Sequence, residues 1–144
     1  MKNKSYIEVN KEQLQALARL PEDQELVMLN LLRYKDRVEE TGLTGEASYR
    51  QYMMAASPFF GKVDAEIVFF GSPKLMLIGP EDQELWDDVL LVKYKNAGEF
   101  FKMTQAKGYP SKLREQSLQD SRLVYCKSNS VYCPGFLVCL IKVI

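Results

Sequence analysis

Five side chains in this sequence have types and spacing that suit the binding or chemistry of a small organic molecule. They are one amide, one guanidinium, two phenols and one indole: Asn30, Arg33, Tyr49, Tyr52 and Trp86. An amide can hold a carbonyl or enolate oxygen, an arginine can fork onto a carboxylate, and a phenol can act as an acid or orient a ligand. We take these residues as the candidate pocket, while the catalytic residues stay unassigned.

Asn30 is the uncharged polar residue in the middle of the apolar stretch 26–34. A buried amide that lacks a hydrogen bond costs about 1–3 kcal/mol. It could hold a ligand oxygen in a cavity, or it could tie down a neighbouring strand or a partner subunit. The sequence leaves both roles open.

Arg33 and Tyr34 end this stretch, and Lys93 and Tyr94 end another apolar stretch, 89–94. If the two stretches are neighbouring strands, we expect these basic and phenolic groups to gather at one rim of a sheet. The alternative for the arginine is an ordinary ion pair, which stabilises little where it is exposed. The acids that could form it are Asp87, Asp88 and Asp120.

Tyr49 and Tyr52 share one face of an expected helix, where core packing is the alternative to lining a pocket. Trp86 lies in the acidic loop 79–88, whose residue order does not match a calcium-binding loop. Solvated charge beside a packing tryptophan explains this loop better than a metal site. Glu84 or Asp87 could still act as a base if burial raised its pKa.

Two absences narrow the chemistry. The chain has no histidine, which removes the commonest general base, metal ligand and haem ligand together. Its three cysteines lie near the carboxyl end without C-x-x-C spacing, and there is no G-x-G-x-x-G, P-loop or G-x-S-x-G motif. We therefore expect no metal and no cofactor, and whether the protein is an enzyme is left open.

The composition is that of one ordinary domain, with 144 residues of which 47% are hydrophobic. Its 19 positive and 19 negative side chains balance without a basic stripe, which argues against nucleic acid or an anionic membrane as a partner. The first residues carry no apolar signal segment, so we expect a cytoplasmic protein with free thiols.

The hydrophobic periodicity predicts an α+β fold, a ferredoxin-like βαββαβ sandwich with an antiparallel sheet. The central stretch 66–94 holds three short apolar runs that we interpret as strands, 67–70, 75–78 and 89–94. The other expected strands are 26–34 and 121–126, and the expected helices are 10–20, 44–60, 96–108 and 111–118. We expect one domain over 1–126, with an N-terminal helix at 10–20 and the βαββαβ core over 26–126.

The strand 26–34 is apolar in both of its alternating rows, whereas a strand with one face in water should alternate. One layer of helices covers only one face of a sheet. We therefore expect a homodimer formed through the sheet faces.

The segment 127–144 ends in an almost wholly apolar run, 136–144, which is too short to cross a membrane. We expect an extra strand added to a sheet edge of this subunit or of its partner. The alternative is a disordered extension with a risk of aggregation.

The chain resembles an uncharacterised family, domain of unknown function thirteen-thirty, in the dimeric α+β barrel superfamily. The resemblance runs from about residue 13 to 126, and the tail after it falls outside the pattern. The segments that carry it are 28–34 (MLNLLRY), 49–52 (YRQY), 67–73 (IVFFGSP), 78–81 (IGPE), 86–94 (WDDVLLVKY) and 118–123 (LQDSRL).

The resemblance implies a ferredoxin-like subunit whose sheet packs on a second sheet. The wider superfamily includes monooxygenases, isomerases, haem-degrading enzymes and dehydratases, many of which use a histidine that this chain lacks. Our first hypothesis is a small-molecule-binding protein, a cofactor-independent monooxygenase or isomerase for an enolisable substrate. The alternative is a non-enzymatic binding or assembly domain with a filled pocket.

Overall fold

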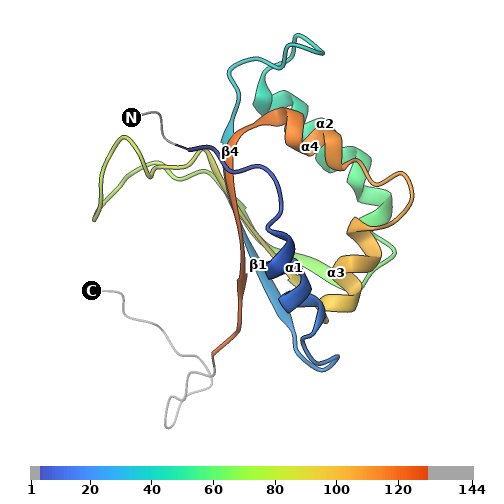
Figure 1. Ribbon diagram of the computed structural model, residues 1–144. Coiled ribbons are helices and arrows are strands. Elements are labelled where there is room, and N and C mark those ends of the chain that lie inside the picture. Colours follow the sequence, from blue (N-terminus) through green and yellow to red (C-terminus); the bar gives the residue numbers. More distant parts are fainter. Residues whose placement is uncertain (1–3, 130–144) are drawn as a thin grey trace.

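The computed structural model describes residues 4–129 and contains four strands and four helices (Figure 1). In chain order these are α1 (Lys11–Ala18), β1 (Leu26–Tyr34), α2 (Gly45–Phe60), β2 (Ala65–Gly71), β3 (Asp88–Tyr94), α3 (Ala97–Thr104), α4 (Ser111–Ser117) and β4 (Leu118–Cys126). The strands form one antiparallel sheet in the order β2-β3-β1-β4. The α+β, ferredoxin-like fold predicted from the sequence is confirmed.

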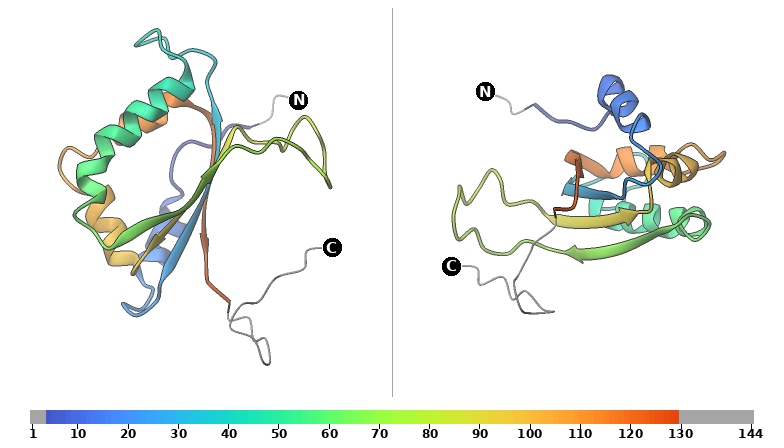
Figure 2. Two further views of the ribbon diagram at one scale, coloured as in Figure 1. Left: turned by 180° about the vertical axis from the view of Figure 1, so that it is seen from behind. Right: turned by 90° about the horizontal axis from the view of Figure 1, so that it is seen from below.

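The helices all lie on one side of the sheet (Figures 1 and 2). Side-chain caps fix where three of them begin, because Asn10, Thr44 and Asn96 each accept a hydrogen bond from a backbone N–H in the first turn of α1, α2 and α3. Pro110 precedes α4, which begins without a side-chain cap hydrogen bond. In α2, Pro58 lies two residues before the last helical residue.

The start of α2 is held against the end of α4 by a close backbone approach at Gly45. A Cβ atom at this position would lie 2.4 Å from the Lys35 carbonyl oxygen and 2.6 Å from that of Ser117, so no larger residue fits without a shift. Ser117 also donates a hydrogen bond of 2.8 Å to the Ser48 hydroxyl. These contacts fix α2 and α4 side by side above the sheet.

The even-numbered positions of β1 and β3 face the helices and are buried, as the period of two in a strand requires. Together with residues from α1 and α3 they form the main hydrophobic core. A second cluster joins Leu32, Tyr49 and Leu118 beneath α2. The core therefore lies between the sheet and the helices.

The other face of the sheet is apolar and no helix of residues 4–129 covers it (Figure 2). We call this the outer face. Its residues are the odd-numbered positions of β1 and β3 with their neighbours on β2 and β4, including Val27, Leu29, Leu31, Phe69, Leu91 and Val124. Phe69 and Val124 are half exposed.

The predicted strand at 75–78 is wrong. The ladder between β2 and β3 ends at the pair Gly71 and Val89, and the residues between them form a long loop. Leu75, Leu77 and Ile78 are 80%, 89% and 94% exposed. The apolar run alone suggested a strand, but no neighbouring strand of residues 4–129 supplies hydrogen bonds to it. The loop extends beyond the outer face, away from the helices (Figure 1).

The predicted N-terminal helix is present as α1, where Leu17 packs into the main core and the helix lies beside α3. The last predicted strand begins earlier than expected, at Leu118. The predicted extra strand within 127–144 lies almost entirely outside the described residues. None of the helices in residues 4–129 is both long and apolar enough to span a membrane.

Candidate functional site

A cavity of about 430 Å³ lies between the helices and the inner face of the sheet. Most of its wall is apolar and comes from β1, β3, α2, α3 and the segment before α1. The polar side chains that reach it include an amide, four phenols and a guanidinium: Asn30, Tyr49, Tyr52, Tyr94, Tyr109 and Arg114. This volume is in the range of small-molecule sites, and a few polar groups in an apolar wall are typical of them.

The tyrosines form a connected aromatic cluster. The ring of Tyr49 lies 5.2 Å from that of Tyr52, and the ring of Tyr52 lies 6.1 Å from that of Tyr109 in an edge-on arrangement. The hydroxyl groups of Tyr52 and Tyr109 are hydrogen-bonded to one another. Tyr34 extends the cluster toward the end of β1, with its ring 5.5 Å from Tyr49.

Burial keeps these phenols neutral. It raises the pKa of Tyr49 to about 12, an effect that the nearby Arg114 guanidinium opposes. The pKa values of Tyr52 and Tyr94 are raised in the same way, mainly by burial, and so is that of Tyr109. At neutral pH the cluster therefore offers hydroxyl protons and carries no negative charge of its own.

Arg114 is the cationic residue of the cavity wall. The Nη2 atom of this side chain is buried and has no hydrogen-bond partner within residues 4–129. Among residues 4–129, the one acidic residue that lines the cavity is Glu115, which is exposed. A buried guanidinium nitrogen without an acceptor is costly, so an acceptor brought by a ligand would be favourable.

Asn30 ties neighbouring strands together, which is one of the two roles that the sequence left open. Its side-chain nitrogen donates to the carbonyl oxygens of Leu90, on the neighbouring strand β3, at 3.3 Å and of Met28 at 3.4 Å. The same residue lines the cavity. Because both donors of the amide nitrogen have backbone partners, the side-chain oxygen is the group left for a further hydrogen bond.

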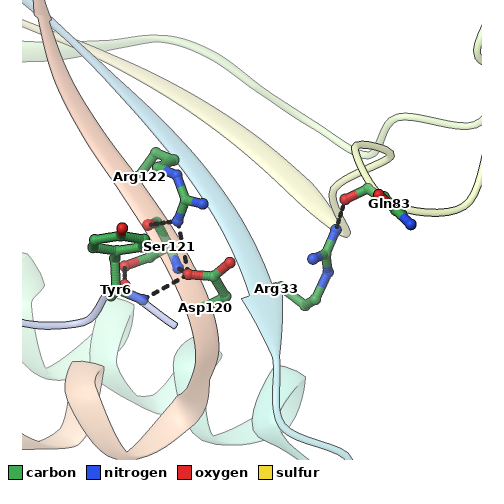
Figure 3. A network of polar contacts seen from close by, with 6 residues as sticks. All are labelled: Tyr6, Arg33, Gln83, Asp120, Ser121 and Arg122. Atoms are coloured by element: carbon green, nitrogen blue, oxygen red, sulfur yellow. Dashed lines mark hydrogen bonds and ion pairs between the residues drawn. The ribbon is translucent and has the colours of Figure 1, made fainter. Parts of the chain in front are cut away.

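Arg33 and Trp86 do not line this cavity, in contrast to the predicted pocket. Arg33 occupies an odd-numbered position of β1 and therefore points to the outer face, where its guanidinium lies 4.6 Å from the Trp86 ring and donates to the carbonyl oxygen of Gln83 (Figure 3). Trp86 also contacts Arg122 at 5.1 Å. The structure brings Asn30, Tyr49 and Tyr52 together and separates Arg33 and Trp86 from them.

The predicted rim of basic and phenolic groups is also wrong. β1 and β3 run antiparallel, with Leu26 opposite Tyr94 and Leu32 opposite Asp88. The carboxyl end of β1 therefore lies beside the amino end of β3, far from the carboxyl end of β3. Tyr34 instead donates to the buried carboxylate of Asp88 at 2.5 Å, and Ser72 donates to the same group.

Asp120 forms an ion-paired corner with Arg122, at 2.7 Å. Asp120 also accepts a hydrogen bond from the backbone N–H of Tyr6, which attaches the N-terminal segment to β4 (Figure 3). Arg33 forms no ion pair with Asp87, Asp88 or Asp120 in the described part of the chain.

The sequence interpretation missed three residues of the site, Tyr94, Tyr109 and Arg114. The sequence could have identified Tyr94, because this residue continues the inward-facing row of β3. No sequence pattern identified Tyr109 or Arg114, since α4 is short and its position depends on docking against α2. Within residues 4–129, no group of three or more histidine, cysteine or acidic side chains could hold a metal ion.

No protein-family model and no curated protein matches the chain. Among solved structures it is similar to RPA0582, a protein of unknown function from Rhodopseudomonas palustris, with 28% identity and a TM-score of 0.80 over 89% of this chain and 100% of that one.

Two further solved structures show more distant likenesses. One is a dimeric ferredoxin-like protein of unknown function from Thermobifida fusca, at 15% identity and a TM-score of 0.47, covering 76% of this chain and 96% of that one. The other is SnoaB, a cofactor-independent oxygenase from Streptomyces nogalater, at 10% identity and a TM-score of 0.44, covering 78% of this chain and 99% of that one. Both are too distant to inform on function.

Proposed function

We propose that this protein binds a small, largely apolar organic molecule in the cavity between helices and sheet. The observation that supports this most is the cavity itself, about 430 Å³ of mostly apolar wall on which an amide, four phenols and a guanidinium converge. A core built only for stability is close-packed and holds few voids larger than a water molecule. The alternative of a pocket filled by side chains has less support from this interior.

If the protein is an enzyme, the site suits cofactor-free proton transfer to, or oxygenation of, an enolisable substrate. The phenols are neutral hydrogen-bond donors, so they favour the negative oxygen of an enolate over the neutral ketone. Asn30 adds a further polar group to the cavity wall. The substrate would have to lose its proton to solvent and enter as its enolate, since the buried wall contains no carboxylate or imidazole base among residues 4–129.

The proposal includes a homodimer whose sheets pack face to face, as the resemblance to the domain of unknown function thirteen-thirty family implies. Its support is the apolar outer face, which no helix of residues 4–129 covers. The exposed apolar loop between β2 and β3 extends beyond the same face and would reach over a second copy. Exposed apolar surface of this extent is typical of protein interfaces.

A cavity-filling pair of variants tests ligand binding. Met53 lines the cavity, whereas its neighbour Met54 on the same helix is 69% exposed. We expect Met53→Trp to abolish thermal-shift responses to a panel of aromatic acids and cyclic 1,3-diketones, and Met54→Trp to leave them unchanged. A panel that stabilises neither the wild type nor Met54→Trp, or stabilises Met53→Trp equally, would contradict the proposal.

A further inference from the structure

We propose that Arg114 anchors an anionic oxygen, in a carboxylate or an enolate, on the molecule that occupies the cavity. This inference rests on the proposed function, because it assigns the ligand class of the same cavity. The ligand would be a monoanion with an apolar body, held at the end of the cavity where α4 meets α2.

The first argument is the state of the arginine itself. The other arginines with buried or partly buried surroundings have partners: Arg122 forms an ion pair with Asp120, and Arg33 donates to a backbone carbonyl and stacks on Trp86. None of the ion pairs among residues 4–129 involves Arg114. Its Nη2 atom is buried and unpartnered. The Arg114 side chain as a whole is partly exposed, but this buried nitrogen lacks an acceptor, so an acceptor oxygen at this place would be favourable.

The second argument is the balance of donors and acceptors around it. The guanidinium is a donor only, and its planar fork matches the two oxygens of a carboxylate. Tyr52 and Tyr109 share one hydrogen bond between their hydroxyls, which uses one of their two protons and leaves the other for a further acceptor. This end of the cavity thus has an excess of donors, and a ligand that satisfies them must bring acceptors.

The third argument is the rest of the cavity wall. Most of it consists of apolar side chains such as Met28, Leu90, Val92, Phe60 and Ile67. A second charged group on the ligand would be desolvated there without a partner. The ligand class is therefore an organic acid or enolate with one anionic end and a flat or compact apolar body.

Matched anionic and neutral probes test this assignment in the full chain. The carboxylate probe is 2-naphthoate, with 2-naphthamide as its neutral partner, and the enolate probe is the anion of dimedone, with its O-methyl ether as the neutral partner. We expect calorimetry to show at least one anion binding about 10- to 100-fold more tightly than its neutral partner, as a hydrogen-bonded charge requires. Whichever pair shows the difference identifies the source of the anionic oxygen.

Variants on α4 connect the effect to Arg114. Arg114→Met should remove the preference for the anion while the neutral partner binds as before. Lys112→Met removes the same charge from an exposed position of the same helix and should change nothing. Arg114→Lys keeps the charge but loses the fork, so it should retain part of the preference. If Arg114→Met does not fold, the anion preference of Arg114→Lys tests the role of Arg114 by itself.

The possible failures are distinguishable. Equal binding of anion and neutral partner, or an undiminished preference in both Arg114 variants, would overturn the role of Arg114 while leaving the cavity as a binding site. Binding of no probe by the wild type, together with no effect of Met53→Trp in the wider panel, would overturn the proposed function itself.

Discussion

The two faces of the sheet are built from the same strands but present opposite chemistry. On the inner face, the even-numbered residues of β1 and β3 border a cavity in which one guanidinium lies among four neutral phenols. On the outer face, most odd-numbered residues are apolar, and the arginines of this face already have partners in Trp86, Gln83 and Asp120.

The two faces differ in whether their arginine side chains have hydrogen-bond or ion-pair partners. The outer-face arginines are stabilised within the subunit, so they need no ligand, and what this face lacks is a cover for its apolar area. The inner face has its apolar area covered by helices, and what it lacks is an acceptor for Arg114. We infer that the outer face is for assembly and the inner face is for a small molecule.

The largest effect should come from placing a charge on the outer face. We expect Leu29→Asp to convert a dimer to a monomer, because an unpaired carboxylate would be buried between two sheets. Light scattering should show the mass halved. Met54→Asp, on the exposed side of α2, serves as the control and should leave the mass unchanged. A wild-type protein that is monomeric at micromolar concentration would refute the face-to-face dimer.

Removing an aromatic ring from the inner face should destabilise the single subunit more than removing one from the outer face. Tyr49 is 1% exposed, whereas Phe69 is 53% exposed. In a Leu29→Asp background, we expect Tyr49→Ala to lower the free energy of unfolding by about 3–5 kcal/mol, the usual cost of removing a buried aromatic ring. Phe69→Ala should cost less than about 1 kcal/mol.

Urea denaturation measures both values, and Tyr49→Phe is the control that keeps the ring and removes only the hydroxyl. Equal losses from the two alanine variants would mean that the two faces contribute equally to the fold of the subunit, against the comparison drawn above.

Much of this arrangement could be predicted from the sequence. The two apolar rows of 26–34 indicated a sheet that is apolar on both faces, and the spacing of Tyr49 and Tyr52 placed both on the inner side of a helix. The alternation along that strand also separates Asn30 from Arg33, since positions three apart point to opposite faces. Grouping the two in one pocket ignored this rule.

Other features of the site depend on tertiary contacts that local patterns do not encode. Arg114 reaches the cavity because Ser117 docks on Ser48 and Gly45 lets the backbones approach. The run at 75–78 has the composition of a strand, and only the absence of a neighbouring strand in the described residues makes it a loop.

The smallest effect should come from the ion-paired corner of the outer face. Burial acts to raise the pKa of Asp120, but hydrogen bonds from the Tyr6 and Ser121 backbone and from Arg122 outweigh it, and the pKa lies below its ordinary value. A lowered pKa in the folded state gives stability that is complete above the unfolded pKa of about 3.9 and is lost as the pH falls through the folded value. We expect Asp120→Asn to cost on the order of 1 kcal/mol at pH 7 and less at pH 2, by urea denaturation at both pH values. Asp23→Asn, at an exposed position before β1, should have no effect at either pH.

Because the corner lies on the outer face, Asp120→Asn should also leave ligand binding in the cavity unchanged. Weaker binding in this variant would show that the two faces are coupled.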